Sequence, residues 1–214
     1  LGEVIVDMIA MDRDAGLDET RGFFKYPGGA TANVDVGVVR MGGSSAFLGA
    51  QADDPFGRFL YRSLMNEGVD VRGMKFRAGE RTVFGFIAVR SDQTKEVMFY
   101  RDHNSEMFLT PEEIDPDMIA RGRIFHFGII CLRTGLKQAA TKKAVEAARA
   151  AGLLVSFDVN YRPHAWPSRE LAMERFADIL PSVDILKIAD EEWPLLFGGP
   201  QREGCPRIAP LPVP

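Results

Sequence analysis

The regular alternation of strand-like and helix-like segments constrains the fold of this chain more than any other feature. Short apolar runs alternate with longer segments whose apolar residues recur every three or four positions. This pattern is typical of a mostly parallel sheet with helices on both faces. Strands are predicted at 3–10, 45–48, 123–130, 153–158 and 184–188. Helices are predicted at 31–41, 55–67, 111–120, 136–151 and 190–197, and one more helix is predicted to begin after Ser168, which caps it.

One stretch departs from the alternation. Between about residues 74 and 100, the strand-like runs GMKF, TVFGFIAV and EVMFY are separated by the turn-like sequences AGER and SDQTK. Helix-type periodicity is absent from this stretch. It therefore predicts a small antiparallel sheet inserted into an otherwise alternating α/β chain.

The charge balance and the cysteine content exclude several classes of protein. The 214 residues include 26 Lys and Arg against 30 Asp and Glu, so there is no basic excess for binding nucleic acid. No apolar run has the length that a membrane span needs. Cys131 and Cys205 have neither a disulfide framework nor metal-ligand spacing. We expect a cytoplasmic protein with neither nucleic acid nor membrane as a partner.

Both ends of the chain are unusual. Five of the 13 prolines fall in the last seventeen residues, GGPQREGCPRIAPLPVP, which show neither strand nor helix periodicity. At the other end, Leu1 lies almost directly against an apolar strand. The expectation is a fragment in which the C-terminal part of the fold is missing and 199–214 form an irregular proline-rich tail.

Polar residues at the carboxyl ends of the predicted strands are the candidates for a binding site, because open α/β sheets bind ligands there. Each also has a structural explanation: Asp7 could cap a strand end, a Gly-Gly pair could form a tight turn, and Asn33 could bond to local backbone. The candidates are Asp7, which closes the first strand, Gly28, Gly29 and Asn33 at the start of the first helix, and Asp158, Asn160 and Arg162 after a later strand.

Taken together, these residues belong to a known pattern. The run PGGATANVDVGVVRMGGSSAFLGAQADDPFGRFL closely resembles the first signature of the ribokinase-like, PfkB-type carbohydrate kinases. The resemblance continues through MFYRD, HFGIICL, SFDVNYRPHAWPS and ILKIADEE, and covers about residues 2–198. Among subfamilies it is strongest to fructokinases, followed by 2-keto-3-deoxygluconate kinases. The matching signature positions are Gly28, Gly29, Asn33, Met41, Gly42, Gly49, Asp53, Asp54, Phe56 and Gly57.

The resemblance implies that Asp7, Gly28, Gly29 and Asn33 contact a sugar. A carboxylate and an amide suit hydroxyl groups, and glycines let the backbone approach closely. It also implies a ribokinase-like α/β domain with a small β-sheet lid that closes over the substrate and can form a homodimer. The division that follows is an incomplete α/β domain at 1–11, 27–72 and 102–198, and a lid at 12–26 and 73–101.

By resemblance, Arg101, Asn160 and Arg162 also reach the substrate. An ion pair is the more frequent fate of an arginine, so Arg101 has that alternative. Two arginines would suit a carboxylated sugar such as 2-keto-3-deoxygluconate, because guanidinium binds carboxylate bidentately, whereas neutral fructose needs no such contact. Both substrates remain open at this point.

Glu192 matches the glutamate of a family element that orders magnesium-bound water near the phosphates of ATP. The asparagine of that element is replaced by Ala189. The alternative is a solvated helix N-terminus, where acidic residues are favoured by the helix dipole.

The family's Gly-Ala-Gly-Asp motif is not among these residues. Its aspartate is the catalytic base, and its backbone N–H groups stabilise the transferred phosphoryl group. The resemblance therefore implies an ATP- and Mg²⁺-dependent kinase that phosphorylates a primary hydroxyl of a hexose such as fructose. For the 214-residue chain itself we expect negligible kinase activity. The alternative is a truncated, non-catalytic sugar-binding protein.

Overall fold

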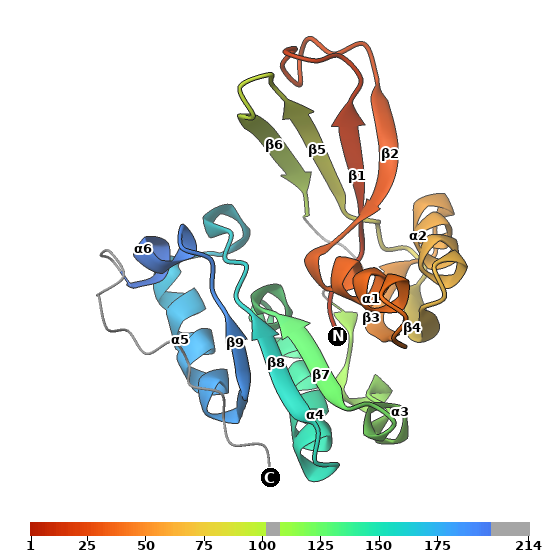
Figure 1. Cartoon of the computed structure of the whole chain (residues 1–214), viewed down its shortest axis with the longest axis vertical. Helices are drawn as coiled ribbons and strands as arrows, with labels where there is room; N and C mark the ends of the chain where they lie inside the picture. The colour runs from red at the N-terminus through yellow and green to blue at the C-terminus, as the bar shows by residue number, and fades with distance from the viewer. Residues whose placement is uncertain (102–107, 198–214) are drawn as a thin grey trace. The chain divides into compact units, whose positions relative to one another are not determined.

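The computed structural model describes residues 1–101 and 108–197, which fall into two compact units (Figure 1). One unit is Gly2–Leu109, and the other is Leu1 together with the chain from Thr110. The predicted proline-rich tail at 199–214, including Cys205, lies outside the described residues. Within the described part, no helix combines the length and apolar character that crossing a bilayer requires.

The Gly2–Leu109 unit contains two sheets. Strand order in the larger sheet is β2-β1-β5-β6, in which β1 and β5 are parallel and the outer pairs are antiparallel. The smaller sheet pairs β3 with β4 in parallel. The elements are β1 (Ile5–Ala10), β2 (Phe23–Gly28), α1 (Ala30–Arg40), β3 (Ala46–Ala52), α2 (Pro55–Asn66), β4 (Asp70–Arg77), β5 (Phe84–Val89) and β6 (Lys95–Tyr100).

Two strands differ from the expected division between α/β domain and lid. β1 was expected in the α/β part, but it is a central strand of the four-stranded sheet. β4 was expected to begin the inserted sheet at residue 73, but it starts at Asp70 and pairs with β3. Asp7 also does not end its strand, because β1 continues to Ala10. Apolar periodicity identifies a strand but does not choose its hydrogen-bonding partner, which explains these differences.

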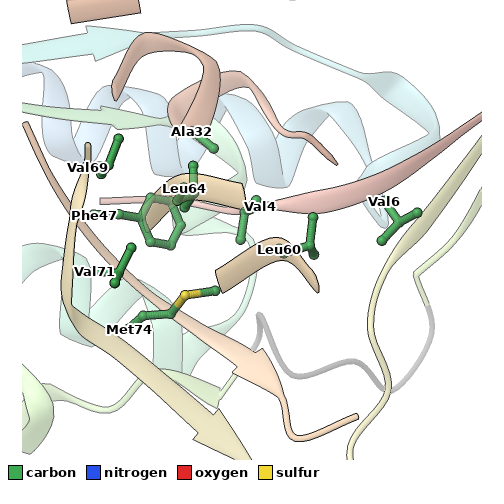
Figure 2. Close-up of a cluster of buried hydrophobic side chains, with 9 residues drawn as sticks. All are labelled: Val4, Val6, Ala32, Phe47, Leu60, Leu64, Val69, Val71 and Met74. Carbon is green, nitrogen blue, oxygen red and sulfur yellow. The ribbon is translucent and has the colours of Figure 1, made fainter. Parts of the chain in front are cut away.

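A hydrophobic core fixes the helices of this unit to the strands (Figure 2). The apolar face predicted for α2 is confirmed, since Leu60 and Leu64 point into this core. Asp54 caps α2 as predicted, accepting hydrogen bonds from the backbone N–H groups of Phe56 at 2.9 Å and Gly57 at 2.7 Å. The buried side chains are Val4, Val6, Ala32, Phe47, Leu60, Leu64, Val69, Val71 and Met74.

The second unit is built on the parallel sheet β7-β8-β9, as the alternation predicted. Phe127 and Phe157 stack at its centre with ring centroids 4.7 Å apart. Its helices and strands are α3 (Pro116–Ala120), β7 (Ile124–Gly128), α4 (Gly135–Ala150), β8 (Leu154–Asp158), α5 (Arg169–Ile179), β9 (Ile185–Lys187) and α6 (Glu192–Phe197), with 3-10 turns at Pro111–Glu113, Ile129–Leu132, Pro163–Ala165 and Leu180–Ser182.

The start of this unit differs from the prediction in one respect. The helix expected over 111–120 is divided into the turn Pro111–Glu113 and α3. Pro116 explains the break, because proline disfavours helical geometry at the residue before it, and Asp115 is extended and caps α3. The predicted Ser168 cap is confirmed, since its hydroxyl accepts the Leu171 N–H at 3.1 Å.

Candidate functional site

Asp7 lies between two glycines on one face of the four-stranded sheet. It pairs with Gly85 on the parallel strand β5, and Gly28 is close to it on β2. A Cβ atom at Gly28 would collide with Oδ2 of Asp7, and one at Gly85 would lie 3.0 Å from Oδ1. The absence of side chains at both positions therefore leaves room for the Asp7 carboxylate.

The environment of Asp7 affects its ionisation. Partial burial raises the pKa of the Asp7 carboxyl above its ordinary value, and the positive charge of Arg101 opposes part of that rise. A half-buried carboxylate with space around it can accept hydrogen bonds from ligand hydroxyl groups.

The start of α1 is held close to the chain that leads into β1. Gly29 has φ +107°, a conformation that favours glycine, and a Cβ there would lie 2.5 Å from the Glu3 carbonyl oxygen. Thr31 accepts a hydrogen bond from the Glu3 N–H at 3.1 Å and donates one to the Glu3 carbonyl at 3.2 Å. Asn33 follows in the first turn of α1 and is exposed. The structure thus brings Asp7, Gly28 and Gly29 together and places Asn33 one turn further on.

Arg101 forms a bidentate ion pair with Glu3. Its Nη1 is 2.5 Å from Oε2 and its Nη2 is 3.3 Å from Oε1. The guanidinium also lies over the Phe99 ring, 4.9 Å from the centroid. Of the two explanations that the sequence allowed for Arg101, the ion pair is therefore present, and its partner is Glu3. The neighbourhood of Asp102 that was expected to supply the partner lies outside the described residues.

The candidates Asp158, Asn160 and Arg162 lie at the end of β8, in the other unit. Asp158 ends β8 and pairs with Lys187 of β9 at 3.1 Å. Asn160 has φ +37°, a left-handed conformation that asparagine tolerates better than most residues. Arg162 is exposed, and its Nη1 donates to the Tyr161 carbonyl at 3.3 Å. Asn160 and Arg162 thus lie where a parallel sheet exposes its carboxyl ends, as predicted.

Glu192 is buried at the start of α6, and its Oε2 accepts the Ala189 N–H at 2.8 Å. This local contact accounts for a buried carboxylate at that position. Among residues 1–101 and 108–197, no group of three His, Cys, Asp or Glu side chains is arranged to hold a metal ion. The role expected for Glu192, a contact to magnesium-bound water, needs no direct metal ligand and stays a prediction.

Two residues of the site were missed by sequence reasoning. Gly85 had a signal, because an isolated glycine inside a strand pattern indicates a close approach by other atoms. Glu3 had none, because its partner Arg101 is 98 positions away in the sequence. Long-range ion pairs of this kind leave no local pattern.

Known proteins share both the sequence and the fold of this chain. The family model described as pfkB family carbohydrate kinase matches residues 1–210. Fructokinase-2 of Solanum lycopersicum is 42% identical over 197 residues, covering 92% of this chain and 60% of that protein. The crystal structure of fructokinase from Xylella fastidiosa has a TM-score of 0.83 at 31% identity and covers 92% of this chain and 60% of that one. The structure of that fructokinase with bound ATP has a TM-score of 0.82 at the same identity.

The chain therefore spans about 60% of the length of the relatives it matches. The agreement runs through both units, and it includes the Gly28, Gly29 and Asn33 segment on which the resemblance was based. This chain belongs to the pfkB family of carbohydrate kinases.

Proposed function

We propose that this chain forms the sugar-binding part of an ATP-dependent sugar kinase that phosphorylates a primary hydroxyl of a hexose such as fructose. The observation that carries the proposal is the Asp7 carboxylate, kept accessible by the missing side chains of Gly28 and Gly85. The fructokinase names of its relatives and the ATP bound to one neighbour support the same assignment.

The proposed role of these groups is to bind and orient the sugar. The Asp7 carboxylate accepts hydrogen bonds from sugar hydroxyls, and the Asn33 amide can both donate and accept. Gly28 and Gly29 allow the sugar to approach the backbone. Orientation of this kind lowers the entropic cost of phosphoryl transfer, in which the acceptor oxygen must lie in line with the phosphate.

The motif Gly-Ala-Gly-Asp, to which the family resemblance assigns the catalytic base and the anion hole, does not occur in these 214 residues. We therefore propose that the 214-residue polypeptide binds a sugar without transferring phosphate to it. A coupled assay with ATP, Mg²⁺ and fructose tests this statement. Turnover by the purified chain would contradict it, while the sugar-binding proposal would remain.

Sugar binding itself is tested by calorimetric titration of the purified chain with fructose. The Asp7→Ala variant is expected to weaken binding by about tenfold or more, because hydrogen bonds to a charged group are lost. Asp12→Ala is a matched control: Asp12 follows the same strand, but its carboxylate is paired with Arg21 on the surface. Equal affinity of the two variants for fructose would refute the role of Asp7.

We also propose a homodimer in which a second copy covers the face of the four-stranded sheet that bears Met98 and Tyr100. Both side chains are exposed on the same face of β6, and a large apolar surface of this kind often marks a contact with another molecule. Light scattering should give twice the chain mass, and Met98→Glu should give the monomer mass. A monomer mass for the unmodified chain would contradict the proposal.

A further inference from the structure

The pair formed by Glu3 and Arg101 is almost withdrawn from solvent. Their side chains are 9% and 12% exposed, and two separate nitrogen–oxygen contacts join them. Glu3 cannot easily move away, because Thr31 bonds to both its N–H and its carbonyl. Arg101 is supported on a second side by the Phe99 ring. The guanidinium is therefore fixed by its surroundings before any ligand arrives.

This fixed pair lies next to the proposed sugar-binding carboxylate. Arg101 is close enough to Asp7 to affect its ionisation. Phe99, which supports Arg101, also faces Gly85, the residue that pairs with Asp7. Glu3, Arg101 and Asp7 thus form one charged cluster at the end of the four-stranded sheet.

The charges in this cluster do not balance. Glu3 neutralises Arg101 through a bidentate contact, the geometry in which guanidinium binds carboxylate most strongly. Among these three side chains, two carboxylates therefore face one guanidinium, and most of its charge is directed at Glu3. A neutral polyol can donate hydroxyl hydrogens to such a site, whereas a sugar carboxylate is repelled and finds Arg101 already occupied.

From this geometry we propose that Glu3 is a positioning residue that sets substrate charge: by occupying Arg101, it makes the site select a neutral sugar over a sugar acid. The inference rests on the proposed function, because it requires Asp7 to bind the sugar. It also weighs against the 2-keto-3-deoxygluconate alternative, since one of the two arginines that would hold its carboxylate is already paired.

The test is calorimetric titration of the 214-residue chain and its variants with three ligands. They are fructose, 2-keto-3-deoxygluconate and the cationic 1-amino-1-deoxyfructose. The unmodified chain should bind fructose at least about tenfold more tightly than the sugar acid. Glu3→Gln frees a positive charge and should shift the ratio of the two affinities by about tenfold toward the sugar acid.

Arg101→Gln removes the positive charge of the pair, whereas Glu3→Gln removes the negative one. It leaves Glu3 and Asp7 both negative, so the preference should shift by about tenfold toward the amino sugar. Glu3→Asp keeps the charge and should restore the preference for fructose. The matched control is Glu67→Gln, which breaks a second bidentate glutamate–arginine pair, with Arg40, on the exposed surface of the same unit. That variant should leave all three affinities unchanged.

The outcomes separate this inference from the proposed function. If the unmodified chain binds none of the three ligands, the sugar-binding proposal fails. If it binds fructose but Glu3→Gln keeps the original ratio of affinities, the role of Glu3 is refuted. If circular dichroism shows that Glu3→Gln does not fold, the role of Glu3 is still tested by two measurements. These are the ratio of fructose to sugar-acid affinity in the unmodified chain and the shift toward the amino sugar in Arg101→Gln. Equal binding of fructose and the sugar acid by the unmodified chain would overturn the inference.

Discussion

The β7-β8-β9 sheet and the β2-β1-β5-β6 sheet both pack aromatic rings together, but they differ in how much of those rings they expose. Phe127 and Phe157 of the first sheet are 0% exposed and stack on each other. In the second sheet, Tyr26 is 51% exposed and Tyr100 is 60% exposed. The first sheet is therefore stabilised by its own packing, while the second leaves apolar surface that another molecule can cover. This difference indicates which sheet maintains the fold and which is available for binding.

The largest expected effect comes from removing a buried ring. Phe157→Ala should lower the free energy of unfolding by about 3–5 kcal/mol, because it removes apolar contacts and leaves a cavity. Tyr100→Ala in the other sheet should lower it by only about 0.5–1.5 kcal/mol, because the ring is largely exposed and its aromatic contact is with Phe86 at 5.5 Å. Urea denaturation followed by circular dichroism measures both. If both variants lose the same free energy of unfolding, the proposed difference between the two sheets is wrong.

A smaller effect is expected where α2 meets the four-stranded sheet. Asp54 caps α2 and also accepts hydrogen bonds from the N–H of Thr82 at 3.1 Å and its hydroxyl at 2.7 Å, just before β5. Asp54→Ala should cost about 1–2 kcal/mol. Its neighbour Asp53 pairs with Arg58 on the surface, so Asp53→Ala, measured in the same urea titration, should cost less than about 1 kcal/mol.

The contribution of Asp54 should also depend on pH. Burial alone would raise the pKa of its carboxyl, but hydrogen bonds from Gly57, Thr82 and Phe56 outweigh it and lower the pKa below 3.8. A carboxyl with a lowered pKa stabilises the fold above its unfolded value, and that stabilisation is lost as the pH falls through the folded value. The difference between the unmodified chain and Asp54→Asn should therefore shrink below about pH 4. A constant difference down to pH 2 would argue against a charged cap.

The smallest expected effect on stability concerns Asp7. Its pH dependence has the opposite sign to that of Asp54. The pKa of Asp7 is raised, so its contribution to stability is present at low pH and lost as the pH rises through the folded value. Asp7→Asn should therefore raise the melting temperature at pH 7 by a few degrees while weakening fructose binding. Thermal melts at pH 4 and pH 7 test this. A lower melting temperature at pH 7 would show that Asp7 stabilises the sheet instead of serving a ligand.

Much of the fold followed from local patterns. The apolar period of α2, its Asp54–Pro55 start, the Ser168 cap and the alternation that produces β7, β8 and β9 all depend on neighbouring residues, so they could be predicted. The partner strands of β1 and β4 could not, because pairing is decided by which apolar faces meet. The break before Pro116 had a local signal in the proline itself.

The candidate site shows the same division. The sequence by itself determined the family, because the signature from Pro27 to Leu60 is a local pattern, and through that resemblance it predicted Asp7, Gly28 and Gly29 as sugar contacts. Only the tertiary structure decided that Gly85 opens the second side of Asp7 and that Glu3 occupies Arg101. The physical reason is distance along the chain: strands β1, β5 and β6 meet through hydrogen bonds and packing, and the charges that they bring together are encoded almost a hundred residues apart.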